Sequence, residues 1–441
     1  MLIEFSLGNY RSFHQPVTLS MQAASLRHRG NIDEQNVFRA GKYTLLRSAA
    51  VYGANASGKS NLVNALMFMR HFVLDSSTKF QAGEPTGVKR FALNAAARQE
   101  PAYFQMVFLL DGIRYRYGFE LDEKQIHAEW LYHTRQRESR LFVREGREFD
   151  ISGLLKKEAA GLQARTRDNA LFLSTLAQFN SPTAIAMLEW FHSKFRGISG
   201  LDDKSYGGYT IHRFETEESF RQQARDLMRL ADVGITDLAI NTLPFDKADV
   251  SEELRDFIRK IAQEEGNPEN ELLLRQIQTL HLLFDGEQQI GQESFDLDEE
   301  SEGTQKFFYL SGPLLDTLEN GITLVVDELE ARLHPLLTRE IVRLFNSPQS
   351  NPHNAQLIFA THDASLLGEC MLRRDQIWFT EKNRHGATDL YSLAEMKERY
   401  DASFDKNYLI GRYGAIPLIG GLRAFFEQEM QDGEKAKAER A

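Results

Sequence analysis

The sequence predicts an α/β fold built around a phosphate-binding loop, and three segments carry this prediction. Residues 53–60 read Gly-Ala-Asn-Ala-Ser-Gly-Lys-Ser, a complete G-x-x-x-x-G-K-[ST] motif. Residues 322–328 form an apolar run that ends in two carboxylates, and residues 356–363 form another that ends in Thr-His-Asp. Buried strands that deliver polar residues at their ends are typical of α/β nucleotide-binding folds.

The phosphate loop has the flanks that its chemistry requires. Residues 49–52 are a short apolar run suited to a buried strand, and residues 61–69 have the apolar spacing of a helix. The N-terminus of such a helix attracts phosphate groups. We therefore interpret the motif as a nucleotide-binding loop, and an ordinary glycine turn is the alternative.

Each residue type in the loop has an expected role. Gly53 and Gly58 let successive backbone N–H groups wrap around phosphate oxygens. Lys59 would reach the β- and γ-phosphates of ATP, and the Ser60 hydroxyl would bind Mg²⁺. The candidate nucleotide-binding residues share this one segment: Gly53, Ala54, Asn55, Ala56, Ser57, Gly58, Lys59, Ser60 and Asn61.

The second apolar run predicts a metal and water site. Asp327 follows the predicted strand directly and is placed to hold Mg²⁺, and Glu328 beside it can polarise a water for attack on the γ-phosphate. A buried strand that ends at a solvated acidic turn is the alternative. His362, after the third run, is the histidine expected to contact the γ-phosphate.

Upstream of these strands, residues 300–305 read Glu-Ser-Glu-Gly-Thr-Gln and precede a helical-looking stretch. Ser301 and Gly303 at a helix start would form an anion site from a hydroxyl and backbone N–H groups. Read alone, the same residues form only a helix cap.

Composition limits the class of protein. The chain has 441 residues, of which 26% are charged and 42% hydrophobic, with a formal net charge of −11. No apolar stretch approaches the roughly 20 residues of a membrane helix, and the start lacks the features of a secretory signal. Cys370 is the single cysteine, which suits a reducing compartment. We therefore expect a cytoplasmic protein without a membrane partner; nucleic-acid binding is not indicated, although a local basic groove stays open.

The order of these motifs resembles the ABC-type ATPase heads of the SMC, RecF and OLD groups. The resemblance implies a head-to-tail dimer that holds two ATP molecules between its subunits. It further implies that Ser301 and Gly303 contact the partner's γ-phosphate, that residues 330–335 form a loop crossing the dimer, and that His362 is the switch histidine. The segment around Ser301 departs from the Leu-Ser-Gly-Gly-Gln of transporter heads, which argues against a transporter.

Both ends of the chain resemble the RloA group of stand-alone ATPases more closely. The segments are residues 5–13, read as Phe-x-Leu-x-Asn-Tyr-Arg-Ser-Phe, and residues 408–417, which include Arg412 and Tyr413. That group implies a bacterial abortive-infection or restriction-linked setting. Relatives act with a separately encoded partner of the RloB type or carry a nuclease domain. Because residues after 363 show no convincing second set of carboxylates, we expect a separate effector protein, RloB-like or a nuclease.

The motifs predict how the chain is divided. Residues 1–120 are expected to form the first half of the head and to include a hairpin over 104–119. Residues 121–295 are expected to form a mainly helical insertion with some strands, including a helix over 251–262. Residues 296–425 would complete the head, and residues 426–441 would form a charged tail.

Two questions stay open in the sequence. The glutamine that senses Mg²⁺ in such heads is assigned to Gln178, with Gln105 as the rival. Scattered basic residues are read as a mixed-charge surface rather than a basic pocket: Arg27, His28, Arg29, Arg70, Arg90 and Arg98.

The sequence therefore predicts a P-loop ATPase head with a helical insertion, using ATP and Mg²⁺ and controlling a partner through ATP-dependent dimerisation. A sensor or scaffold that binds ATP without turnover is one alternative. A RecF-like DNA-processing ATPase is another.

Overall fold

The computed structural model describes residues 1–26, 32–202, 204–231, 234–244, 252, 273–368, 371–399 and 401–417. The chain divides into two compact units. The first unit comprises Met1–Gly197, Gly321–Glu328 and Val342–Ala441, and the second comprises Ile198–Asn320 and Leu329–Ile341.

A seven-stranded antiparallel sheet forms one part of the first unit, in the order β10-β9-β8-β7-β6-β1-β2. Its strands are β1 (Leu2–Gly8), β2 (Val17–Ser20), β6 (Ala102–Leu110), β7 (Ile113–Leu121), β8 (Ile126–Thr134), β9 (Glu138–Glu145) and β10 (Glu148–Ile151). Asp111 and Gly112 join β6 to β7 with φ values of 50° and 73°. Both residues are therefore left-handed, as a two-residue hairpin turn requires. The hairpin predicted over 104–119 is confirmed.

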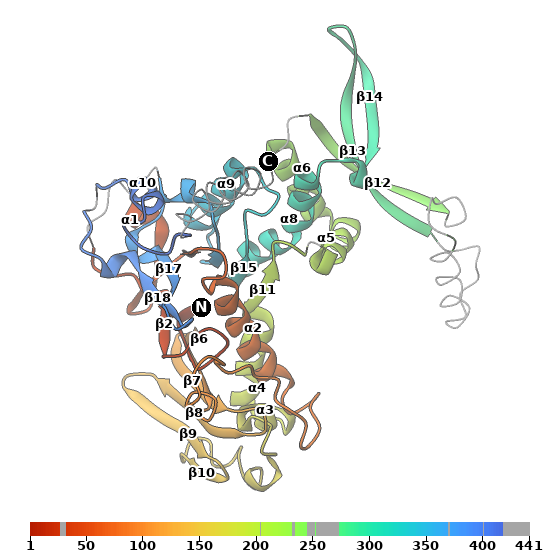
Figure 1. The fold of residues 1–441 in the computed structure, drawn as a ribbon. Coiled ribbons are helices and arrows are strands. Elements are labelled where there is room, and N and C mark those ends of the chain that lie inside the picture. Colours follow the sequence, from red (N-terminus) through yellow and green to blue (C-terminus); the bar gives the residue numbers. More distant parts are fainter. Residues whose placement is uncertain are drawn as a thin grey trace, which may run out of the picture. The chain divides into compact units, whose positions relative to one another are not determined.

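Helices cover the apolar face of this sheet. They are α2 (Lys59–Asp75), α3 (Phe172–Gln178) and α4 (Pro182–Glu189), and Figure 1 shows α3 and α4 beside β7 and β8. Phe104, Phe108 and Phe119 are fully buried and belong to the same hydrophobic cluster as Phe172. Burial of such large aromatic side chains is the main favourable contribution to this part of the fold.

A six-stranded sheet carries the predicted site, in the order β11-β15-β16-β5-β17-β18. Its strands are β5 (Ser48–Tyr52), β11 (Phe195–Ser199), β15 (Thr323–Asp327), β16 (Gln356–Ala360), β17 (Ile377–Lys382) and β18 (Thr388–Ser392). Strands β15, β16, β5 and β17 are parallel neighbours. β5 and β16 are buried along their whole length, which explains their continuous apolar sequences.

Shorter elements complete the described part of the first unit. They are α1 (Ile32–Asn36), β3 (Val37–Ala40), β4 (Tyr43–Leu46) and α10 (Phe404–Leu409). Strands β3 and β4 form an antiparallel pair.

The second unit packs helices against a three-stranded sheet. The helices are α5 (Lys204–Thr216), α6 (Glu218–Ala231) and α8 (Glu302–Asn320), and the strands are β12 (Ile235–Pro244), β13 (Leu273–Asp285) and β14 (Gln288–Asp296). Figure 1 shows β13 and β14 as a long ribbon. Gly312 of α8 lies so close to α5 that an added Cβ would be 2.2 Å from Thr210 Oγ1. α9 (Pro335–Asn346) begins in the second unit and ends in the first.

The two units divide the chain at other places than the predicted boundaries. Residues 121–197 belong to the first unit, because β8, β9 and β10 continue a sheet that contains β1, β6 and β7. The segment around Ser301 belongs to the second unit, because α8 packs on α5 and α6. The described part of residues 200–295 contains the helices α5 and α6 and the strands β12, β13 and β14. The helix predicted over 251–262 and the tail over 426–441 lie outside the described residues.

Candidate functional site

The phosphate loop lies between β5 and α2 and is held by two threonines from the neighbouring strands. Thr380 of β17 shares a hydrogen bond of 2.7 Å with the Ser57 hydroxyl. Thr388 of β18 donates to the Ser57 carbonyl oxygen at 2.7 Å. Gly58 has φ +125°, and an added Cβ would be 2.5 Å from Thr388 Oγ1. The loop therefore needs glycine at 58 for both conformation and space.

Gly53, the first glycine of the motif, is required because there is no room for a side chain at this position. A Cβ on Gly53 would lie 2.3 Å from Ser57 Oγ and 2.6 Å from the Thr380 carbonyl oxygen. Ala56, between the two glycines, has φ +62°, a left-handed conformation that is unusual for alanine. Asn55 and Ala56 are exposed, whereas Ser57 and Gly58 are buried. The loop is thus a tightly confined turn with an accessible outer edge.

The last two residues of the motif, Lys59 and Ser60, lie in the first turn of α2. The Lys59 ammonium donates to the carbonyl oxygens of Gly53 at 2.9 Å and Ala54 at 3.3 Å, so the side chain lies across the loop. The Asn61 amide donates to Ser12 Oγ at 2.8 Å, and Thr388 shares a 2.8 Å hydrogen bond with the same Ser12 oxygen. These hydrogen bonds place the N-terminal segment of residues 5–13 against the phosphate loop.

Asp327, at the end of β15, is the residue that fits a metal. Burial raises its pKa, while a hydrogen bond with the Ser60 hydroxyl and the charge of Lys59 favour the ionised form. Its Oδ1 atom is buried and has no hydrogen-bond partner. Buried carboxylate oxygens are rarely unpaired, and Mg²⁺ is bound by one or two carboxylates together with phosphate oxygens and water. Asp327 and Ser60 therefore fit a Mg²⁺ ion that arrives with a nucleotide.

The described residues contain no cluster of three or more His, Cys, Asp or Glu side chains that could hold a metal ion by themselves.

Glu328 and His362 lie at the same edge of the sheet. Glu328 follows Asp327 with φ +53°, a left-handed conformation that is uncommon outside glycine. Strained conformations of this kind gather at functional sites. His362 is exposed and follows β16, where Thr361 N–H donates to the Val51 carbonyl oxygen at 3.0 Å. Because β15, β16 and β5 are parallel, their carboxyl ends bring the three predicted segments together.

The C-terminal segment supports the phosphate loop, a role that the sequence did not reveal. The Tyr408 hydroxyl accepts a hydrogen bond from the Gly53 N–H, and its ring lies 5.5 Å from the Tyr52 ring. The Tyr413 hydroxyl donates to Glu398 at 3.0 Å, and Arg412 lies 3.4 Å from the same carboxylate. The distinctive run over 408–417 therefore acts by packing behind the loop.

In the second unit, Ser301 serves as a helix cap. Its hydroxyl accepts the Thr304 N–H at 3.2 Å at the start of α8. A Cβ on Gly303 would lie 2.9 Å from the Arg332 carbonyl oxygen, so glycine allows the loop over 330–335 to approach the helix. Buried Lys306 holds this loop by donating to the Leu329 and Ala331 carbonyl oxygens. A pocket of about 610 Å³ lies here, lined in part by Ser301, Gly303, Arg332 and His334.

The structure does not bring Gln178 to the site. Its amide donates at 3.0 Å to the Ser77 carbonyl oxygen, just beyond the C-terminal end of α2. Ser60 lies in the first turn of that helix, and a helix of 17 residues is about 25 Å long. Gln178 is thus too distant to share a metal with Ser60. The rival, Gln105, accepts from Arg116 and Trp130 within the seven-stranded sheet.

The described residues of the basic set that was predicted to form a mixed-charge surface are engaged in separate contacts. Arg70 donates to the Phe191 and Phe195 carbonyl oxygens, and Arg90 pairs with Glu123 at 2.5 Å. Arg98 donates to the Ala92 carbonyl oxygen at 2.8 Å. Cys370 and residues 27–29 lie outside the described residues.

With this geometry established, comparison with known families decides the assignment. The family described as "AAA domain, putative AbiEii toxin, Type IV TA system" matches residues 48–368, which include all the site segments. The chain belongs to this family. The predicted α/β P-loop ATPase fold is confirmed by this match and by the strand order around β5. No curated protein matches the chain.

Two solved structures of ATPase heads align over most of the chain, at low scores. One is titled "Crystal structure of the SmcHead bound to the C-winged helix domain of ScpA", with 13% identity, a TM-score of 0.39 and coverage of 89% of this chain and 97% of that chain. The other is CbiO1 from Clostridium perfringens, part of the ABC transporter complex CbiONQ, with 10% identity, a TM-score of 0.29 and 90% coverage of both chains.

Within the described ranges, no helix has the length and apolar character needed to cross a bilayer. The finer resemblance to the RloA group stays a prediction.

Proposed function

We propose that this protein binds ATP with Mg²⁺ at the phosphate loop and hydrolyses it. The observation that carries the proposal is the buried, unpaired Oδ1 of Asp327, whose carboxylate is hydrogen-bonded to Ser60 and lies near the charge of Lys59. A carboxylate, a hydroxyl and an ammonium in this arrangement fit a nucleotide triphosphate and its metal. Bound Mg²⁺ would neutralise charge that develops on the phosphates.

The residues of this chain have separate roles in the proposed reaction. Lys59 leaves the carbonyl oxygens of its own loop and contacts the β- and γ-phosphates. Glu328 orients the attacking water and accepts its proton, and His362 contacts the γ-phosphate. Phosphoryl transfer depends mainly on such positioning and charge compensation.

We further propose that two copies close head to tail on two ATP molecules. The support is the resemblance to SMC-type heads together with the exposure of Ser301, Glu302, Arg332 and His334 around the pocket at the start of α8. In this proposal Ser301 and Gly303 of one copy approach the γ-phosphate held by the other. The loop over 330–335 then contributes to the interface.

The proposed role of this cycle is control of a separate effector in a bacterial anti-phage system. The family description names an AbiEii toxin and a type IV toxin–antitoxin system, which supports a defence setting. The proposed partner is a separately encoded protein, RloB-like or a nuclease, that is released or activated when the heads open or close.

The test is ATP turnover combined with solution mass for the wild type, Lys59→Ala and Glu328→Gln. We expect turnover in the wild type, no ATP binding in Lys59→Ala, and an ATP-stabilised dimer or larger assembly in Glu328→Gln. Tight ATP binding without turnover in the wild type would favour the sensor alternative instead. Titration of DNA at two salt concentrations tests the RecF-like alternative, because contacts to phosphates weaken steeply with salt.

A further inference from the structure

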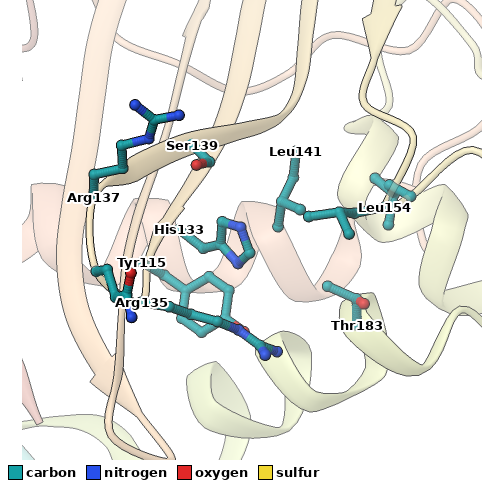
Figure 2. A pocket seen from close by; sticks show the side chains of 10 residues that line it. Tyr115, His133, Arg135, Arg137, Ser139, Leu141, Leu154 and Thr183 are labelled. Atoms are coloured by element: carbon teal, nitrogen blue, oxygen red, sulfur yellow. The ribbon is translucent and has the colours of Figure 1, made fainter.

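A second pocket lies in the first unit, between the turn of the β8–β9 hairpin and α4. Its volume is about 590 Å³, within the range of small-molecule sites. Tyr115, His133 and Ser139 stand opposite one another on β7, β8 and β9 and form one row across the sheet. Figure 2 shows the rings of Tyr115 and His133 facing the helix that carries Thr183. Leucines complete the lining: Leu141, Leu154 and Leu155.

His133 places an accessible imidazole in the wall of this pocket. The side chain is only 9% exposed, lines the pocket, and makes no hydrogen bond within the described part of the chain. Burial, aided by the charge of Arg135, lowers its pKa, so the imidazole is neutral at physiological pH. A neutral imidazole offers one donor and one acceptor. Its ring nitrogens are not among the buried unpaired atoms, so they are accessible from the pocket, where a bound ligand can pair with them.

Two arginines at the pocket opening are available to an anion. Arg135 and Arg137 are exposed in the hairpin turn and form no ion pair among the described residues. The other arginines of this hairpin region are paired: Arg114 and Arg116 with Glu138, and Arg140 with Asp150. The charge of Arg135 lowers the pKa of Tyr115 against the effect of burial, and Figure 2 shows Arg137 at the outer edge of the pocket.

One acidic group beside the pocket, Glu158, is already engaged by other residues. Glu158 is engaged by Ser181 and by the N–H and hydroxyl of Thr183, so it caps α4. Burial raises the pKa of Tyr115, with Arg135 opposing the rise and Asp111 adding to it. The formal net charge of the whole chain is −11, so a local pair of uncompensated arginines is a distinct feature.

The lining combines three kinds of surface. Arginine suits phosphate, because its planar guanidinium binds two oxygens at once. Tyr115 and the leucines offer an aromatic and apolar surface, on which a nucleobase can stack. His133 and the Ser139 hydroxyl would meet the polar edge of a base or sugar, which a simple alkyl chain could not pair.

We propose that this pocket binds a nucleoside phosphate, free or at the end of a single strand, with its phosphate at Arg135 and Arg137 and its base against Tyr115. This site is separate from the phosphate loop. It does not depend on ATP binding there.

The experiment uses the full-length chain carrying Lys59→Ala, so that the phosphate loop does not contribute binding. Titration calorimetry with AMP, GMP, CMP and UMP measures affinity, and the His133 ring signal in NMR reports the location. Arg135→Gln is the test variant, since the side chain is exposed and its replacement does not threaten folding. Arg140→Gln is the matched control, because it removes the same charge from the neighbouring strand.

We expect at least one monophosphate to bind and to shift the His133 signal. Arg135→Gln should weaken this binding by about tenfold or more, the effect of losing a charged hydrogen bond. Arg140→Gln should change it by less than about twofold, as for an exposed ion pair. A 5′-phosphorylated dinucleotide distinguishes the source: tighter binding than the monophosphate indicates a strand end, and equal binding indicates a free nucleotide.

Three results would overturn the proposal. The first is no binding of any monophosphate or of the dinucleotide at millimolar concentration. The second is equal affinity for inorganic phosphate, which would remove the base from the site. The third is unchanged binding in Arg135→Gln.

Discussion

Replacing Asp327 with asparagine should raise the stability of the nucleotide-free protein while weakening its Mg²⁺-dependent ATP binding. The Oδ1 atom of Asp327 is buried without a partner, and burial raises the pKa of the carboxyl. An unsatisfied buried polar group costs about 1–3 kcal/mol, and more when it is charged. Asparagine removes the charge but keeps an oxygen for the Ser60 hydroxyl. We therefore expect a gain of about 1 kcal/mol, or about 2 °C in melting temperature.

The pH dependence of this gain has a definite sign. The folded pKa of Asp327 lies above its ordinary value of 3.8, so its favourable contribution to stability is present below that value. The contribution is lost as the pH rises through the folded pKa. The melting-temperature difference between Asp327→Asn and the wild type should therefore be largest at neutral pH. It should shrink as the pH falls towards the ordinary carboxyl range.

The nucleotide-bound state should respond in the opposite direction. An amide is a poorer Mg²⁺ ligand than a carboxylate, so the increase in ATP affinity that Mg²⁺ provides should fall by at least about tenfold, or 1.4 kcal/mol. ATP affinity without Mg²⁺ should be unchanged or higher, because a negative charge near the phosphates is gone. Calorimetric melting and fluorescent-nucleotide titration, each with and without Mg²⁺, measure the two effects.

Glu328→Gln is the matched control, since it removes the same charge from the next residue. It should abolish turnover while retaining the Mg²⁺-dependent gain in ATP affinity. A less stable nucleotide-free Asp327→Asn, or an undiminished Mg²⁺ effect in that variant, would refute the reasoning.

Three further predictions follow from the packing of the first unit. Gly58→Ala should weaken ATP binding by at least about tenfold in a folded protein checked by circular dichroism, because its Cβ would meet Thr388 at 2.5 Å in a left-handed backbone. Tyr408→Phe should weaken ATP binding about fivefold in the same titration, because the hydrogen bond that positions Gly53 is lost. Unchanged affinity would contradict either assignment. Glu129→Gln should destabilise the protein by about 3 kcal/mol in calorimetric melting. Glu129 is fully buried, its carboxylate accepts two backbone N–H groups, and its Oε2 lies 3.7 Å from Arg144 Nη1. An unchanged melting temperature would contradict this account.

The segments of the proposed site could be found from the sequence because each is local. The phosphate loop is one contiguous motif whose glycines and lysine are set by backbone conformation and charge over eight residues. The Asp327–Glu328 pair and His362 were recognisable because each follows a short, continuously apolar strand. The hairpin over 104–119 was likewise determined by two adjacent residues that tolerate left-handed backbone.

The boundaries of the two units and the position of Gln178 could not be predicted from local sequence patterns. Residues 121–197 looked like the start of an insertion, but their strands β8, β9 and β10 pair in turn beyond β7 and extend the first sheet. Gln178 lies in a segment similar to those that carry a metal-sensing glutamine. Its helix, however, docks at the C-terminal end of α2, away from Ser60. Where a helix docks depends on which apolar faces meet, and local patterns do not record that.

The sequence by itself determined that a nucleotide loop, an acidic pair and a histidine exist, because short-range spacing specifies their conformations. Only the tertiary structure decided which residues support the phosphate loop. Thr380, Thr388 and Tyr408 are more than 300 residues from the loop along the chain, and threonine and tyrosine are ordinary residues in strands and helices. They reach the loop because β17 pairs with β5. This pairing depends on burial and on hydrogen bonds between strands that are distant in the sequence, and local sequence patterns do not specify it.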